Sequence, residues 1–284
     1  MRSDPPALSR QGVDRAAHLR VDERWRSCTP MQVVLLDDQG RTLISDEDDG
    51  PHLVLSDDVE PVFFLGVGEE GAAYGAAVVE LPRKIGARPM GLREVGALLD
   101  DRDAGLLTHA VALANWHATH THCPRCGALT EPTLGGSVRR CTADGSEHFP
   151  RTDPAVIMLV HDGADRCVLG RQPSWPTDRF STLAGFVEPG EAAELAVGRE
   201  VQEEVGIPVT DVTFRGSQPW PFPSSLMLGF WARATDDVIT LDGSELAEAR
   251  WLTREQLRRE EVLLPPPVSI AWRLITDWLE GPPA

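Results

Sequence analysis

The sequence has no long apolar run and few cysteines. Its first twenty residues lack the apolar run of a secretory signal, and no segment approaches the ~18 apolar residues of a membrane-spanning helix. Five cysteines in 284 residues suit a reducing compartment better than a disulfide framework. We therefore expect a cytoplasmic protein that does not enter a membrane.

Positive charge is also scarce. The chain has 27 lysine and arginine residues against 44 aspartate and glutamate residues, which gives a formal net charge of −17. Because affinity for a nucleic-acid backbone depends on clustered lysine and arginine, we do not expect a broad nucleic-acid surface. A nucleotide at one RNA end stays compatible with this balance. The length allows two domains, and no tandem repeat is present.

Residues 185–207 carry the strongest chemical signal. The spacing predicts a helix over residues 191–205, which Gly206 ends. Three acidic side chains at positions i, i+3 and i+4 then share one face of that helix: Glu200, Glu203 and Glu204. This helix therefore brings together carboxylates that repel one another.

Two interpretations of these carboxylates are open. A solvated acidic face is the usual role of a glutamate-rich helix. Against it, the opposite face is apolar at Leu195, Val201 and Val205, and a tight glycine-containing segment, residues 183–186, precedes the helix. Clustered carboxylates beside such a turn are typical of Mg²⁺ sites. We therefore expect metal ions at Glu200 and Glu204 to bridge the phosphates of a substrate.

Two neighbouring residues complete the expected site. Arg199 is predicted to orient the glutamates through charge-assisted hydrogen bonds rather than to contact substrate. Glu203 is either a general base or a further metal ligand, and the sequence does not separate these roles.

The whole segment resembles the Nudix box, G-x5-E-x7-R-E-U-x-E-E-x-G-U with U apolar, at every specified position. Random occurrence of such a pattern has a frequency on the order of 10⁻⁹ per start position. The resemblance implies hydrolysis of a diphosphate by a metal-dependent enzyme.

A second motif, residues 217–227, narrows the substrate. Three prolines in five residues predict a rigid, extended backbone that holds Trp220 and Phe222 in place, although a proline-rich loop packed over the core is the plainer interpretation. The segment resembles the S-Q-P-W-P-F-P-x-S signature of the NADH pyrophosphatase branch of the Nudix superfamily. That resemblance implies Mg²⁺- or Mn²⁺-dependent cleavage of NADH, and less efficiently of NAD⁺, to nicotinamide mononucleotide and AMP by a homodimer.

The resemblance also implies individual contacts. The residues expected to contact the dinucleotide are Ser217, Gln218, Pro219, Trp220, Pro221, Phe222, Pro223, Ser224, Ser225 and Met227. The carbonyl of Ala184 and the carboxylate of Glu245 would complete the metal shell of Glu200 and Glu204, unless Glu245 is a surface residue. Phe149 is either a stacking partner of the substrate or a core residue. Ala271 is either a substrate contact or a packing residue.

A zinc ribbon is the second metal site that the sequence suggests. Cys123 and Cys126 have the spacing of a zinc knuckle, and Cys141 stands where a second pair would begin. The fourth cysteine is missing, and Asp144 or His148 would have to replace it. The alternative is a ribbon that has lost its metal and is held by packing alone.

The chain is predicted to be an α/β protein in three parts. An N-terminal α+β domain covers residues 1–120, a zinc-ribbon-like insert covers 121–150, and a Nudix α/β/α sandwich with a mixed sheet covers 151–284. We expect strands at residues 33–36 and 62–65, helices at 104–117 and 269–279, and a solvated acidic loop at 46–58. Residues 92–94 and 115–117 resemble the family's N-terminal domain, in which we expect no chemistry.

Three other functions compete with NADH cleavage, and the acidic balance disfavours one of them, a zinc ribbon that acts as a nucleic-acid module. Removal of an NAD cap from RNA 5′ ends would use the same bond and the same glutamates. A catalytically silent regulator would bind NAD or a nucleotide sugar and control a partner. The intact set of Arg199, Glu200, Glu203 and Glu204 argues against that regulator, because a sensor needs no complete set of metal ligands.

Overall fold

The computed structural model describes residues 5–28, 30–241, 243 and 245–281. Contacts within the described chain form two compact units. Unit 1 consists of residues 5–7, 153–219 and 225–281, and unit 2 consists of residues 8–152 and 220–224. The five residues 220–224 therefore belong to unit 2 although the strands on either side of them belong to unit 1. The predicted three-part division stays a prediction.

Unit 1 is built on a mixed β-sheet. Its strands are β11 (Asp153–His161), β12 (Arg166–Arg171), β13 (Leu183–Phe186), β14 (Val209–Trp220), β15 (Ser225–Ala234) and β16 (Glu248–Thr253). The sheet order is β14-β15-β11-β12-β16, with β13 beside β11. β11 runs parallel to β15 and antiparallel to β12 and β13.

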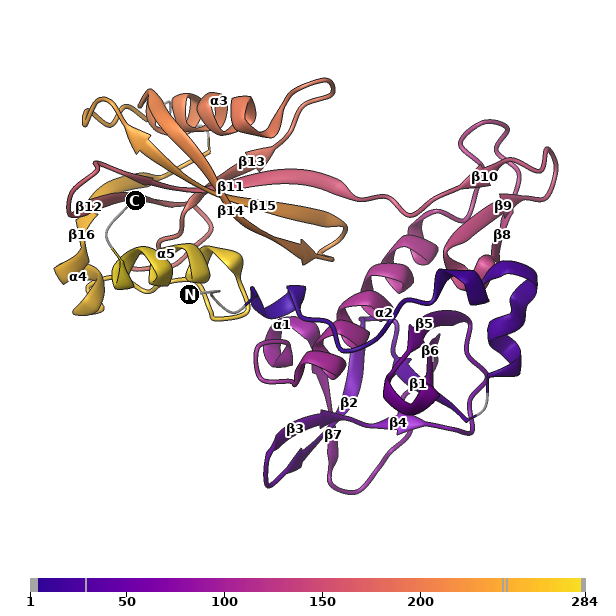
Figure 1. The fold of residues 1–284 in the computed structure, drawn as a ribbon. Helices are drawn as coiled ribbons and strands as arrows, with labels where there is room; N and C mark the ends of the chain where they lie inside the picture. The colour runs from indigo at the N-terminus through magenta and orange to yellow at the C-terminus, as the bar shows by residue number, and fades with distance from the viewer. Residues whose placement is uncertain (1–4, 29, 242, 244, 282–284) are drawn as a thin grey trace. The chain divides into compact units, whose positions relative to one another are not determined.

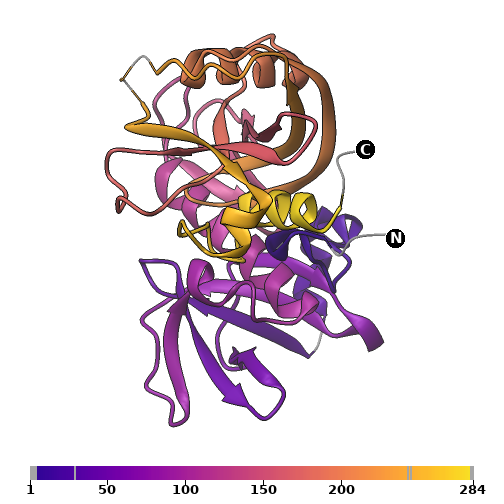
Figure 2. The same cartoon turned by 90° about the vertical axis from the view of Figure 1, so that its left-hand side faces the viewer.

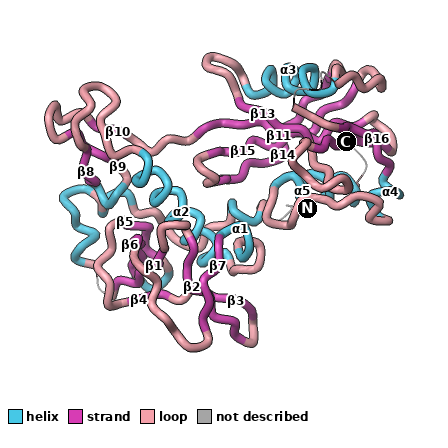
Figure 3. The backbone as a smooth tube through the Cα atoms, turned by 180° about the vertical axis from the view of Figure 1, so that it is seen from behind, coloured by secondary structure: helices cyan, strands magenta, loops and turns pink. Residues whose placement is uncertain are grey.

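Helices cover both faces of this sheet (Figures 1 and 3). The helices are α3 (Ala193–Val205), α4 (Arg254–Arg258) and α5 (Ile270–Glu280). One apolar cluster joins Val156 and Val160 of β11 to α3, and another joins Leu159 of the same strand to α5. Because side chains alternate along a strand, β11 supplies both cores. The predicted α/β/α sandwich is confirmed, and Figure 2 shows α3 and α5 on opposite sides of the strands.

Unit 2 contains three small sheets and one long helix. Its strands are β1 (Met31–Leu36), β2 (Arg41–Glu47), β3 (Gly50–Leu53), β4 (Leu55–Ser56), β5 (Phe63–Val67), β6 (Ala73–Val78), β7 (Ala87–Gly91), β8 (Thr130–Thr133), β9 (Val138–Cys141) and β10 (Glu147–His148). The sheet orders are β4-β1-β6-β5, β3-β2-β7 and β10-β9-β8. The helices are α1 (Leu92–Val95) and α2 (Asp101–Thr119), and short 3-10 turns lie at Ala7–Ser9, Ala17–Leu19, Val21–Ser27, Glu69–Gly71 and Leu134–Gly136.

The prediction of a solvated loop over residues 46–58 is wrong. Glu47 of β2 pairs with Gly50 of β3, so two residues connect a hairpin. Gly50 has a φ of 130°, which suits a tight turn at a glycine. The amide of Leu53 donates to the buried carboxylate of Asp103 at 2.8 Å. Acidic composition therefore did not prevent a hairpin, because a residue fifty positions away stabilises it.

The ribbon strands β8–β10 are joined to α2 by a buried polar network. Arg139 donates to Nδ1 of His117 at 2.7 Å and to the carbonyl of Thr130 at 2.6 Å. Because arginine only donates, Nδ1 of His117 accepts, and its Nε2–H donates to the carbonyl of Gly136 at 2.8 Å. Burial lowers the pKa of His117 to about 4. The histidine is therefore neutral at pH 7, and it fixes the ribbon to the helix.

Candidate active site

Helix α3 presents the predicted carboxylates in two environments. Glu200 and Glu204 are buried at 8% exposure each, whereas the side chain of Glu203 is 58% exposed. Val201 and Val205 pack in the core, as expected, but Leu195 is 69% exposed, so its assignment to the apolar face is wrong. Gly206 adopts a left-handed φ of 70° and ends the helix as predicted.

The carboxylate of Glu200 lies directly against the backbone of Gly185. A Cβ atom built on Gly185 would stand 1.9 Å from the carboxyl carbon of Glu200 and 2.1 Å from each of its oxygens. No side chain fits in that space, so the first glycine of the segment allows the acid to approach strand β13. The neighbouring residue on that strand is Ala184, whose carbonyl is the expected metal ligand.

Gly185→Ala is expected to remove most activity while the fold is retained, because the new methyl group displaces the carboxylate of Glu200. The matched control is Gly198→Ala on α3, where a Cβ meets nothing within 4 Å, and where alanine favours a helix by about 1 kcal/mol. Turnover and thermal unfolding of both variants test this expectation. Equal activity in the two variants would contradict the placement of Glu200.

Arg199 is bonded to three carboxylates. Its Nε and Nη2 donate to the two oxygens of Glu191 at 2.8 Å each, in a bidentate pair. Its Nη1 donates to Glu200 at 2.8 Å and to Glu203 at 2.9 Å, and Nη2 also donates to the carbonyl of Phe186 at 2.9 Å. These bonds lower the pKa of Glu191 to about 2. Arg199 therefore holds the acids in a fixed arrangement.

Burial and charge repulsion destabilise the ionised forms of Glu200 and Glu204. Burial, followed by the charges of Glu200 and Glu245, raises the pKa of Glu204 to about 8. The pKa of Glu200 is also raised, again chiefly by burial. Oε2 of Glu204 is buried and has no hydrogen-bond partner. A divalent cation would satisfy that oxygen and offset the repulsion, so the donor set fits a hard metal ion.

Glu245 lies close enough to act electrostatically on both buried glutamates. Its side chain is exposed, in the connection before β16. Within the described part of the chain, the groups of potential ligands whose atoms lie within 4.8 Å of one another do not include Glu245 with Glu200 and Glu204. The metal-ligand role of Glu245 stays a prediction.

The proline-rich segment, residues 217–227, includes the turn of a β-hairpin and is not extended along its whole length. Residues 220–224 are called the hairpin end below. β14 ends at Trp220, a turn covers residues 221–224, and β15 begins at Ser225. Within the turn, the amide of Phe222 donates to the carbonyl of Trp220 at 2.7 Å. The rings of Trp220 and Phe222 meet edge to face at 5.0 Å. The prediction of an extended backbone therefore holds only as far as Trp220.

Three of the predicted substrate contacts are directed into the core. Gln218 has no exposed surface, and its amide donates to the carbonyl of Val268 at 3.0 Å. Met227 packs against the cluster under α5, and Ala271 lies in that cluster at 1% exposure. The packing interpretation of Ala271 is therefore the one that its burial supports. Phe149 is 67% exposed, so the alternative that it is a core residue is wrong.

Sequence reasoning missed two residues that hold the hairpin end. Asn115 of α2 donates its side-chain amide to the carbonyl of Pro221 at 2.8 Å. The guanidinium of Arg93 lies 4.2 Å from the ring centroid of Phe222 and 5.5 Å from that of Trp220. Both residues fall in segments that resemble the family's N-terminal domain, where no chemistry is expected. No local pattern links them to a segment more than one hundred positions away.

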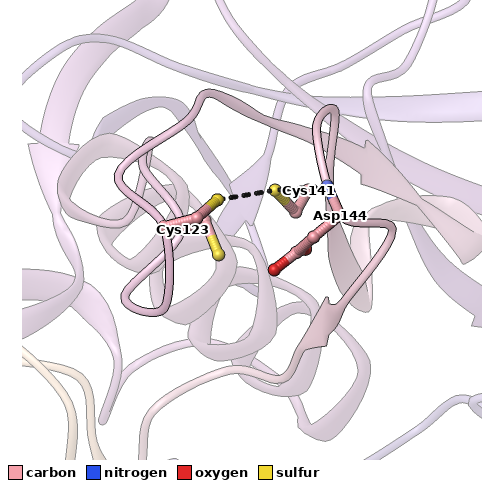
Figure 4. Close-up of side chains that lie close together, drawn as sticks. Cys123, Cys141 and Asp144 are labelled. Atoms are coloured by element: carbon pink, nitrogen blue, oxygen red, sulfur yellow. Dashed lines mark hydrogen bonds between the residues drawn. The ribbon is translucent and has the colours of Figure 1, made fainter.

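The ribbon brings four potential metal ligands together, and Figure 4 labels three of them, Cys123, Cys141 and Asp144. Ligand atoms of Cys123, Cys126, Cys141 and Asp144 all lie within 4.8 Å of one another. His148 is not part of this group, and its Nε2 lies 3.2 Å from the hydroxyl of Ser146. Hydrogen bonding by Ser146 lowers the pKa of Cys123 to about 6 and that of Asp144 to about 2. A backbone hydrogen bond from Ala128 favours the thiolate of Cys126, but hydrogen bonding with Cys141, burial and Cys123 outweigh it and raise the pKa of Cys126 to about 11. Cys123 and Asp144 are therefore favoured as the anions that zinc requires, whereas Cys126 would have to lose its proton when zinc binds.

Three family models match successive parts of the chain. A family model described as a NUDIX domain matches residues 151–272, the NADH pyrophosphatase zinc ribbon domain matches residues 118–149, and an NADH pyrophosphatase-like rudimentary NUDIX domain matches residues 23–116.

Similarity to curated relatives extends over nearly the whole chain. The protein is 41% identical over 298 residues to proteins named NAD-capped RNA hydrolase NudC in Mycobacterium bovis (strain BCG / Pasteur 1173P2) and Mycobacterium tuberculosis (strain ATCC 25618 / H37Rv), with 96% of this chain and 94% of each relative covered. It is 40% identical over 197 residues to NAD-capped RNA hydrolase NUDT12 of Homo sapiens, with 64% of this chain and 43% of that protein covered.

The fold, the carboxylate cluster and these matches together define a Nudix hydrolase. Within that superfamily the chain belongs to the NADH pyrophosphatase branch, as its zinc ribbon and rudimentary Nudix domain show.

Proposed function

We propose that this enzyme hydrolyses the central diphosphate of NADH and NAD⁺ to AMP and nicotinamide mononucleotide, which stays reduced when the substrate is NADH and oxidised when it is NAD⁺. The observation that carries the proposal is the pair of buried acids, Glu200 and Glu204, with an unpartnered oxygen on Glu204. A diphosphate is an anion, and this chain has a net charge of −17. The two would repel each other unless cations lie between them.

The residues of this site would have different roles. Glu200, Glu204, the carbonyl of Ala184 and Glu245 would hold Mg²⁺ or Mn²⁺, which when bound supplies an acidified water and charge neutralisation at the diphosphate. Arg199 keeps Glu200 and Glu203 in position through the hydrogen bonds described above. Glu203 is exposed at the edge of the cluster, where it can accept a proton or add a ligand.

The aromatic residues would define the substrate class. Trp220 and Phe222 form a paired aromatic surface, and Phe149 offers an exposed ring to a base or a nicotinamide. The predicted dinucleotide contacts are completed by Ser217, Pro219, Pro221, Pro223, Ser224 and Ser225.

A homodimer in the cytoplasm is part of the same proposal. None of the helices in the described part of the chain is long and apolar enough to cross a membrane.

Removal of an NAD cap from RNA is the second candidate function. The curated relatives that cover this chain are named NAD-capped RNA hydrolases. The bond and the acids would be the same, and an NAD cap differs from free NAD⁺ only in the RNA chain attached to the adenosine. Rates on NADH, NAD⁺ and an NAD-capped RNA, measured at matched concentrations, test which substrate is preferred. The same intact carboxylate cluster argues against a catalytically silent regulator.

A zinc ion in the ribbon is a separate proposal. Cys123, Cys126 and Cys141 would supply three thiolates, and Asp144 would take the place of the fourth cysteine. Zinc accepts a carboxylate in such a tetrahedral set. The position of Asp144 among the three sulfur atoms supports it over His148.

The purified protein is expected to contain about one zinc ion per chain. Asp144→Ala should release that zinc to a chromophoric chelator far faster than the wild type, because one ligand is lost. His148→Ala is the matched control and should behave like the wild type. Elemental analysis and chelator kinetics measure both. A wild type without zinc would show that the ribbon has lost its metal, and rapid release only from His148→Ala would assign the fourth ligand to His148.

A further inference from the structure

Asn115 lies where α2 meets the hairpin end of residues 220–224. Its side-chain amide donates to the carbonyl of Pro221 at 2.8 Å, and the carbonyl of Pro223 lies 3.5 Å from the same nitrogen. Both contacts lie within unit 2. Asn115 is the only asparagine in the sequence. Pro221 is a buried residue, and its carbonyl is satisfied by this donor.

Two of the five residues of the hairpin end are prolines. Pro221 and Pro223 have no amide hydrogen, so they cannot donate across the turn. A backbone hydrogen bond within the turn joins the amide of Phe222 to the carbonyl of Trp220. The bond from Asn115 to the carbonyl of Pro221 adds a donor from outside the hairpin. Asn115 supplies that donor from a helix of 19 residues whose apolar side is buried.

The hydrogen bond from Asn115 to the carbonyl of Pro221, called the clamp below, lies beside two aromatic rings. Trp220 and Phe222 flank Pro221 and meet edge to face, and the guanidinium of Arg93 stacks on Phe222. Rotation of the Pro221 peptide would move both rings, because each is one residue away. Fixing one carbonyl therefore fixes the orientation of an aromatic pair.

We propose that Asn115 is a positioning residue for the dinucleotide, acting through Pro221 on Trp220 and Phe222. The rudimentary Nudix domain that contains Asn115 thereby contributes to substrate affinity. This inference rests on the proposed function, in which the aromatic pair contacts the substrate.

Three variants separate positioning from packing. Asn115→Ala removes the donor, and Asn115→Asp keeps the shape but places a carboxylate against the carbonyl of Pro221. We expect the KM for NADH to rise about fivefold to tenfold in Asn115→Ala, which corresponds to the loss of one hydrogen bond. A larger rise is expected in Asn115→Asp, with kcat little changed in both. Thr119→Ala is the control and should retain the wild-type KM, because it leaves the side chain of Asn115 in place. The hydroxyl of Thr119 bonds the backbone carbonyls of Asn115 and Trp116 and the ring of His120.

The order of the two variants is the decisive kinetic result. If Asn115 only filled space, the isosteric aspartate would be the milder change and the alanine the more severe, and the proposal would be overturned. Equal KM values in all variants of an active enzyme would overturn it as well.

Hydrogen–deuterium exchange tests the clamp without any substrate. The amides of Phe222 and Ser224 should exchange faster in Asn115→Asp than in the wild type, while peptides from β11 stay unchanged. Unchanged exchange in the hairpin would overturn the clamp whatever the kinetics show. If the wild type fails to cleave NADH while exchange in the variant is faster, the proposed substrate is wrong and the clamp itself stands.

Discussion

Glu204→Gln is expected to lower turnover of NADH by about 10²–10³-fold, the usual loss when one strong electrostatic contributor is removed from an active site. The substitution keeps the volume of the side chain and removes the charge of one proposed metal ligand. Glu194→Gln, at an exposed position of the same helix, is the matched control and should retain full activity. Near wild-type turnover of Glu204→Gln in excess Mg²⁺, with an unchanged circular dichroism spectrum, would refute the metal assignment.

The same substitution should make the stability of the metal-free protein less dependent on pH. Burial and neighbouring charges raise the pKa of Glu204 in the folded, metal-free protein from its ordinary value of 4.5 to about 8, so the folded state binds the proton more tightly than the unfolded state. The free energy of unfolding should therefore fall as the pH rises from about 4.5 to about 8. Glutamine carries no charge, and Glu204→Gln should lose less stability over that range. Chelator-treated protein melted at pH 5 and pH 9 measures this difference, and parallel curves would contradict the burial of a strained acid.

Trp220→Ala is expected to lower kcat/KM for NADH by about tenfold to a hundredfold, because a truncated aromatic anchor commonly costs a few kcal/mol of binding. ADP-ribose, which lacks the nicotinamide, should lose much less. Phe214→Ala removes an exposed ring from the same strand and is the control for a general effect on β14. Equal losses on NADH and ADP-ribose would mean that Trp220 supports the fold, and the specificity argument would fail.

The sequence predicted the parts of the site that depend on local spacing. Glu200 and Glu204 are four positions apart on a helix, so a period of 3.6 residues places them on one face, and Gly206 ends that helix. The mixed sheet with a helix on each face is also confirmed. These features follow from rules that act over a few residues.

The parts that the sequence did not predict depend on partners far away in the chain. The hairpin of β2 and β3 is stabilised by Asp103, and the turn after Trp220 is held by Asn115. Gln218 looked like a substrate contact, but tertiary packing directs its side chain to Val268. Leu195 looked like a core residue, but the helix turns that position toward solvent. Spacing along the sequence contains no information about these contacts.

The most direct test of the account is chromatographic identification of the products formed from NADH. In the presence of Mg²⁺ or Mn²⁺, the wild-type enzyme should release reduced nicotinamide mononucleotide and AMP in equal amounts, and Glu204→Gln should release almost none. Cleavage of the nicotinamide–ribose bond, or no cleavage by a folded protein supplied with either metal, would contradict the assignment of this site to diphosphate hydrolysis.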